Sequence, residues 1–251
     1  MAAGADPFDT RATHLETQVD MALRPRPGLW IEASLPWVRK TLDNPGLPPG
    51  GVPGHPDVAH KELDGIGDVR AWTRWRAREW LTLSLGLELP TGETVASPYA
   101  AESSGHTVMQ IGGGTFDPMI EANVALRAGP VEPFAAALAV LVLYANDHGF
   151  QGGDQVLGEA GAAWPLVAGR LRPHAGLTAL WRGRDRMPRV ITEDTGGVAV
   201  YASPGISARV WRGVWLETLA RLPIVQRPNS LQLVEDYQLF GGVSLALPAA
   251  R

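Results

Sequence analysis

A run of leucines at every second position is the feature that most limits what this chain can fold into. Between Trp80 and Pro90, leucine occupies positions 81, 83, 85, 87 and 89, with Thr, Ser, Gly and Glu between. Successive side chains of a β-strand point to opposite faces. The run therefore predicts a half-buried antiparallel strand that carries its leucines on one face.

Other segments predict a mixture of strands and helices. Further strands are expected at residues 29–35, 69–77, 107–111, 120–126, 178–181, 197–201 and 213–219. The apolar run 134–145 follows Pro133, a residue tolerated in the first turn of a helix, and 155–171 predicts a second helix. Residues 13–23 have weak helical spacing, and 230–239 predict a C-terminal helix capped by Asn229 or Ser230. The predicted fold class is α+β: a mainly antiparallel sheet with two central helices and a C-terminal helix packed on one face.

The 251 residues fit one domain, 1–251, with no internal repeat. A Pro- and Gly-rich stretch at 44–60 predicts an irregular loop that ends an N-terminal subregion, residues 1–60.

Composition narrows the function classes. The net charge is −4 and the pI about 5.9, which argues against a nucleic-acid binder. The absence of cysteine excludes disulfides and thiolate chemistry. The N-terminal residues lack an apolar signal segment, and the longest apolar run, twelve residues, is shorter than a membrane-spanning helix. We therefore expect a cytoplasmic protein with no membrane partner.

No motif predicts catalysis or a cofactor. His55 and His60, with Asp57 and Asp64 nearby, form the best metal-like group, but five residues across a proline is the wrong spacing for a ligand pair. The Gly112–Gly114 triplet lacks a phosphate-binding pattern, and Ser103 and Ser104 lack the context of a nucleophile. We expect no enzyme activity, no metal and no cofactor.

Arginine and tryptophan alternate between residues 70 and 80. Trp72, Trp75 and Trp80 stand among Arg70, Arg74, Arg76 and Arg78. We interpret this as an edge strand with Trp inward and Arg outward. Because both residue types are enriched in protein interfaces, Trp72 and Trp75 are also candidate partner contacts.

From Phe116 onward the chain resembles the immunity proteins encoded beside type VI secretion effectors. The segment 134–145 leads into His148-Gly149, and His174-Ala175-Gly176-Leu177 follows. Ser203-Pro204 precedes the strand 213–217, after which Pro223, Asn229 and Tyr237 fall at the family's spacing. The chain departs from the family just before Asn229, where Gln226-Arg227-Pro228 replaces a Gly-Asp pair, and the N-terminal hundred residues show no match.

The resemblance implies an immunity protein that binds and neutralises a cognate toxin effector, such as a nuclease, by occlusion. It assigns no catalytic residues, and Pro223, Asn229 and Tyr237 would be structural. An acidic face would meet a basic toxin cleft, with candidate contacts at Asp147, Asp154, Glu159, Glu193 and Asp194. The partner would be the toxin, and the protein a monomer or homodimer. A metal-dependent hydrolase and a structural protein of a phage or secretion particle are the alternatives.

Overall fold

The computed structural model describes residues 11–43, 60–94, 111–187, 190–191, 195–229 and 237–247, and builds them almost entirely from strands. The strands are β1 (Arg11–Arg26), β2 (Leu29–Asp43), β3 (His60–Ile66), β4 (Val69–Arg78), β5 (Leu81–Leu89), β6 (Asp117–Ala125), β7 (Glu132–Val140), β8 (Gln155–Ala163), β9 (Leu171–Arg182), β10 (Arg186–Met187), β11 (Val190–Ile191), β12 (Gly197–Trp211), β13 (Val214–Pro228) and β14 (Gln238–Leu247). Within these ranges no helix is long and apolar enough to cross a membrane.

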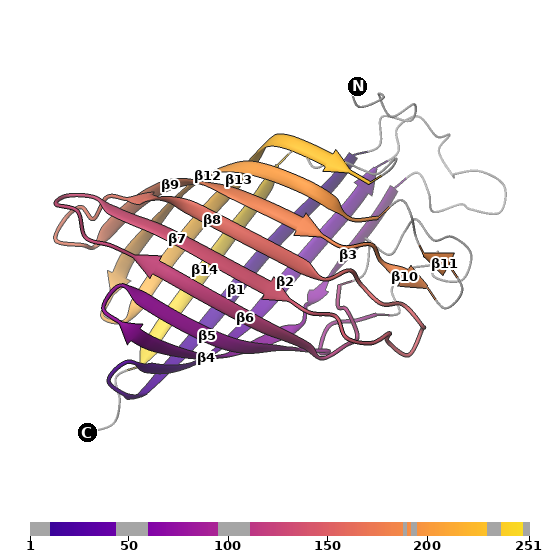
Figure 1. The fold of residues 1–251 in the computed structure, drawn as a ribbon, viewed down its shortest axis with the longest axis horizontal. Helices are drawn as coiled ribbons and strands as arrows, with labels where there is room; N and C mark the ends of the chain where they lie inside the picture. Colours follow the sequence, from indigo (N-terminus) through magenta and orange to yellow (C-terminus); the bar gives the residue numbers. More distant parts are fainter. Residues whose placement is uncertain are drawn as a thin grey trace.

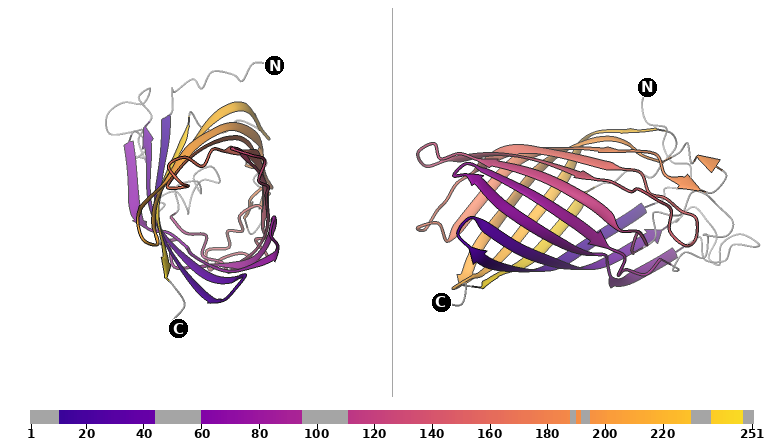
Figure 2. Two further views of the ribbon diagram at one scale, coloured as in Figure 1. Left: turned by 90° about the vertical axis from the view of Figure 1, so that its left-hand side faces the viewer. Right: turned by 60° about the horizontal axis from the view of Figure 1, so that its bottom comes forward.

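The strands form a closed barrel (Figure 1; Figure 2, left). The order in the sheet is β1-β14-β13-β12-β9-β8-β7-β6-β5-β4-β2-β3, and β1 also pairs with β2, so that eleven strands make a ring. The twelfth, β3, continues the line of β4: both pair with β2, and Gly67 donates its N–H to Pro36 O at 3.0 Å between them. Closure leaves the ring with no unpaired edge.

An odd number of strands determines how the ring closes. Neighbours along the chain are antiparallel, so the first and last of eleven strands must run in the same direction. Accordingly β1 and β14 pair in parallel, from Leu15 opposite Leu239 to Leu23 opposite Leu247. We call this β1–β14 junction the seam.

The two ends of the barrel differ. Tight connections join β1 to β2, β4 to β5, β6 to β7, β8 to β9 and β12 to β13 at one end, the short-turn end. Longer connections, including residues 141–154 and 183–196, leave the opposite, long-loop end. The described chain starts at the long-loop end with β1 and finishes at the short-turn end with β14.

The predicted α+β class is wrong, because both central helices are strands. Residues 134–145 contribute to β7 and the connection after it, and residues 155–171 contribute β8, a turn and the start of β9. Both faces of β7 are apolar, since Phe134 and Leu138 alternate with alanines, and such a run has the composition of a buried helix. Residues 13–23 lie in β1, not in a surface helix.

The predicted C-terminal helix, 230–239, is also wrong for those of its residues that the structure describes. Gln238 and Leu239 begin strand β14, and residues 230–236 lie outside the described part of the chain. The predicted subregion 1–60 contributes β1 and β2 to the same ring as the rest. Its Pro- and Gly-rich loop, with His55, falls outside the described residues, as does most of 107–111.

Candidate functional site

The outward face of the barrel is a continuous apolar band. The alternation that predicted strand β5 is confirmed, but its leucines face outward: Leu85 is 66% exposed, whereas its neighbour Ser84 is 2% exposed. Large exposed apolar residues occur on ten of the eleven ring strands, and β7 presents alanines instead. The large residues include Leu15, Val19, Met21, Ile31, Leu35, Leu83, Ile120, Val156, Leu177, Val198, Ile206, Leu216, Leu239 and Val243. A water-soluble monomer rarely exposes so large a contiguous apolar area.

Exposed aromatic side chains border this band. One set lies toward the short-turn end: Trp75, Trp80, Trp164 and Trp211. The other set lies toward the long-loop end: Trp37, Phe116, Tyr144, Trp181 and Tyr237. On β2 and β3 the band stops just beyond Trp37, where Arg39 forms an ion pair with Glu62. Aromatic rings at two levels, with charges beyond them, are the pattern of a barrel that crosses a lipid bilayer.

The inward face is charged. Arg74 of β4 donates to Glu32 of β2 at 2.8 Å, to Ser84 of β5 at 3.2 Å and to Glu121 of β6. Its guanidinium also lies 4.9 Å from the centre of the Trp72 ring. The Arg74–Glu121 contact reaches across β5 on the face that carries the buried Ser84, opposite the face of the exposed Leu85, and this is the inward face. Arg74 thus ties three neighbouring strands together from inside the barrel.

A second arginine links the strands nearer the long-loop end. Arg70 donates to Glu88 at 2.7 Å and lies 3.6 Å from Glu16, whose other oxygen is 3.7 Å from His14 Nε2. These residues come from β4, β5 and β1, so the network passes behind β2. Together, the Arg70 network and the Arg74 contacts line one wall of the interior with paired charges.

A carboxylate also bridges the seam from the inside. Asp20 of β1 accepts hydrogen bonds from Ser34 of β2, from Gln18 at 3.0 Å and from Ser244 of β14 at 3.5 Å. The two seam strands are separated by more than 200 residues of sequence. The buried Asp20 therefore joins the first and last strands of the ring.

Two inward aromatic rings lie directly on glycines of the next strand. A Cβ built on Gly86 of β5 would collide with the indole of Trp72, and one on Gly205 of β12 would collide with the imidazole of His174. Glycine allows each ring to lie flat against the wall. The interior keeps free space that an upright ring would fill.

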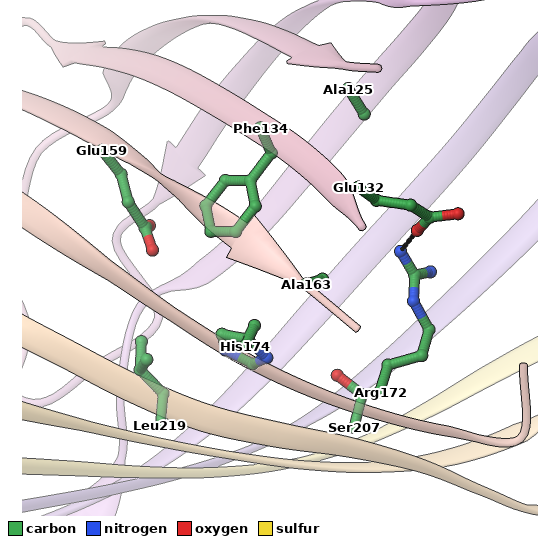
Figure 3. A pocket seen from close by; sticks show the side chains of 9 residues that line it. All are labelled: Ala125, Glu132, Phe134, Glu159, Ala163, Arg172, His174, Ser207 and Leu219. Carbon is green, nitrogen blue, oxygen red and sulfur yellow. Dashed lines mark hydrogen bonds and ion pairs between the residues drawn. The ribbon is translucent and has the colours of Figure 1, made fainter. Parts of the chain in front are cut away.

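Beside His174 this free space forms a cavity of about 300 Å³ near the short-turn end. Residues of six strands line it: Ala125, Glu132, Phe134, Glu159, Ala163, Arg172, His174, Ser207 and Leu219 (Figure 3). Arg172 pairs with Glu132 on one side, while Glu159, Phe134 and His174 converge on the other. The Phe134 and His174 rings meet edge to face, with centroids 6.4 Å apart. Charged, aromatic and hydroxyl groups thus share one luminal pocket.

Loops at the long-loop end are tied to the barrel rim. The Asp68 carboxylate accepts from Gly92 N at 2.8 Å and from Gly113 N at 2.6 Å. The Asn146 amide donates to Gly113 O at 3.0 Å and accepts from Phe150 N at 3.1 Å. Nearby, Asp185 accepts from Gly153 N at 2.8 Å. The described connections at this end are therefore ordered by buried polar side chains.

The structure disperses the residues proposed as toxin contacts. Asp147 is exposed at the long-loop end, and Asp154 there accepts from Val142 N at 2.8 Å. Glu159 lies inside the barrel. Glu193 and Asp194 fall outside the described residues. No single acidic face unites the three that are described.

Trp72 and Trp75 lie on opposite faces of β4. Trp72 is buried in the interior beside Arg74, and Trp75 is exposed in the apolar band. The interpretation of an edge strand with Trp inward and Arg outward holds for Trp72 alone: Trp75 faces outward, and β4 is not an edge strand. β4 is covered by β2 and β5, and Arg70 and Arg74 point inward.

The three residues proposed as structural lie near the end of the chain. Pro223 is opposite Tyr201 at an irregularity in the β12–β13 ladder. Asn229 donates its side-chain amide to Thr195 O at 2.8 Å, and so holds the connection before β12; the residues that it was predicted to cap lie outside the described part of the chain. Tyr237 is half exposed just before β14.

Sequence reasoning missed most of the luminal residues. Glu132, Phe134, Arg172 and His174 were assigned to no site, and the cavity depends on all four. The available signal was polar residues at every second position between apolar ones, as in Leu171-Arg172-Pro173-His174-Ala175. Repeated over segments of about ten residues, this is the weak sequence signature of a transmembrane barrel.

Comparison with known proteins supports the fold. A crystal structure of an outer membrane channel from Pseudomonas putida F1 superposes with a TM-score of 0.58, covering 87% of this chain and 76% of that one. The two sequences are 11% identical. The likeness is one of fold. No protein-family model and no curated protein matches the chain.

The cytoplasmic location predicted from the sequence is wrong. That prediction used the length of the longest apolar run, a criterion that applies to membrane helices. Here the apolar surface comes from alternate residues of separate strands, and the closed ring satisfies the backbone hydrogen bonds that lipid cannot. The expectation of a protein confined to the cytoplasm, as an immunity protein would be, is contradicted for the same reason.

Proposed function

We propose that this protein is a transmembrane β-barrel channel of an outer membrane, through which small polar solutes pass. The observation that carries the proposal is the reversal of the two faces: exposed residues of the ring are apolar, and charged residues point inward. Small water-soluble barrels fill their interior with side chains or hold one small ligand. A charged interior behind an apolar exterior suits water inside and lipid outside.

Three further features support this function. The aromatic residues at both borders of the band match the two interfaces of a bilayer. Strands of nine to sixteen residues are long enough to cross the hydrocarbon core at a tilt. The structural neighbour is an outer membrane channel. By analogy with such barrels, the short turns would face the periplasm and the long loops the exterior.

The toxin-neutralising function stays a prediction. It assumed a cytoplasmic protein with a single acidic face, and the barrel has neither an acidic face that unites the described candidates nor the features expected of a cytoplasmic protein. The expectation that the chain is not an enzyme also stays a prediction.

Conductance tests the channel directly. The purified barrel, inserted into planar lipid bilayers in 1 M KCl, should give stepwise currents. Ala136 and Ala137 provide a matched pair, because they are neighbours on β7 that face the interior and the exterior respectively. Ala136→Trp should lower the unit conductance, and Ala137→Trp should leave it unchanged. A folded, inserted barrel that passes no current would overturn the proposal.

A further inference from the structure

Two carboxylates inside the barrel differ from all others on its inward face. Six of the inward carboxylates are held by a basic side chain or by hydrogen-bond donors: Glu16, Asp20, Glu32, Glu88, Glu121 and Glu132. Asp117 is hydrogen-bonded to Thr115. Glu159 and Glu217, by contrast, make no hydrogen bond and no ion pair in the described part of the chain.

These two residues flank the same pocket. Glu159 lines the cavity, and Glu217 lies opposite Ser207, which also lines it. The nearby ionisable groups are His174 for both, Arg221 for Glu159, and Arg172, Asp20 and Glu32 for Glu217. Arg172 is already paired with Glu132, and Arg221 lies against the Phe240 ring at 4.7 Å. The pocket therefore presents carboxylate oxygens with no basic group bound to them.

The rest of the lining is suited to a hydrocarbon group. Phe134, Leu219, Ala125 and Ala163 provide apolar surface, and the Phe134 ring lies beside Glu159 (Figure 3). Opposite Phe134 in the ladder is Gly161, followed by Gly176, so the adjoining wall has no side chains at that level. An aromatic ring next to a carboxylate is a favourable setting for an ammonium group, through charge and cation–π attraction.

We propose that this pocket is a binding site for organic ammonium ions on the route through the barrel, with Glu159 as the main counter-charge. The ammonium group would bind Glu159, and the alkyl part would pack on Phe134 and Leu219. A metal ion fits less well, because the described residues contain no group of three side chains able to hold one. An anion is disfavoured because Arg172 is occupied. The inference deepens the proposed channel function and rests on it for its place on a solute's path.

The test uses n-butylammonium as the probe and n-butanol as its uncharged counterpart. In planar bilayers, n-butylammonium should block the potassium current in proportion to its occupancy, while n-butanol should not. Glu159→Gln should raise the half-blocking concentration at least fivefold, and Phe134→Leu should raise it by a smaller factor. Glu79→Gln is the control, because it makes the same change of charge in the exposed β4–β5 turn.

The outcomes separate this inference from the channel proposal. If current flows but n-butylammonium does not block it, or blocks Glu159→Gln equally well, the ammonium site is overturned and the channel stands. If no current flows, the channel proposal fails, and calorimetric titration of n-butylammonium into the detergent-solubilised barrel decides the site. Binding to wild type and Glu79→Gln but not to Glu159→Gln would support it, and equal or absent binding would overturn it.

Discussion

At the scale of single residues, the interior of this barrel is organised around arginines that each satisfy carboxylates on two other strands. Arg74 connects Glu32 and Glu121, and Arg70 connects Glu88 and Glu16. Each arginine is planar and carries several donors, so one side chain can bind two acceptors at once. Lysine carries its three donors on a single nitrogen, so it would not match the planar, spread-out geometry of these contacts.

Arg74→Gln should destabilise the barrel by about 2–4 kcal/mol, because it leaves two partly buried carboxylates without their cation. Urea unfolding in lipid vesicles would measure the loss. In the double variant Arg74→Gln with Glu121→Gln, one of the uncompensated charges is gone, and part of the stability should return. Equal losses in the single and double variants would show that the uncompensated Glu121 charge costs nothing.

At the scale of elements, the alternation of apolar and polar residues predicted where strands form, but not which of their faces points outward. Leu81–Leu89, the stretch 29–35 and all but the last residue of 120–126 are strands, as expected. A period of two does not reveal whether the apolar face contacts a core or lipid. In β7, alanine between larger apolar residues removes the alternation altogether, which is why a helix was predicted there. The pocket could not be foreseen, because it depends on the curvature that turns the inward side chains of six neighbouring strands toward one space.

A substitution at Leu85 tests whether lipid or water surrounds the outward face. It lies in the middle of β5, and Leu81 lies four residues away, beside Trp80 at the short-turn border. In a bilayer, Leu85→Arg should cost about 2–4 kcal/mol and Leu81→Arg about 0–1 kcal/mol, because the penalty for a charge falls toward the interface. Unfolding in vesicles would compare them. Two equally small losses would mean that this face contacts water.

At the scale of the whole molecule, the barrel has distinct ends. Arginine occurs at or beside each of the five tight connections: Arg26, Arg78, Arg127, Arg170 and Arg212. The opposite end carries the longer connections, with Asp68, Asn146 and Asp185 binding their backbone. This asymmetry provides the basis for a preferred orientation.

Because the chain has no cysteine, single cysteines report which end is accessible. His148 is exposed at the long-loop end and Ala128 at the short-turn end. With a membrane-impermeant maleimide, His148→Cys should be labelled in intact cells, and Ala128→Cys only after the outer membrane is permeabilised. The reverse pattern would turn the proposed orientation around.

The parallel seam has a consequence for engineering. In a barrel with an even number of strands, the first and last strands have their free ends on one side, so a short hairpin can join them and the chain can be reopened elsewhere. Here the start of β1 and the finish of β14 lie at opposite ends of the barrel. If the barrel spans a membrane as proposed, a circular permutation would need a linker that crosses roughly 30 Å of bilayer thickness through its interior. Reporter domains fused to the two ends of the ring would accordingly be delivered to two different aqueous compartments.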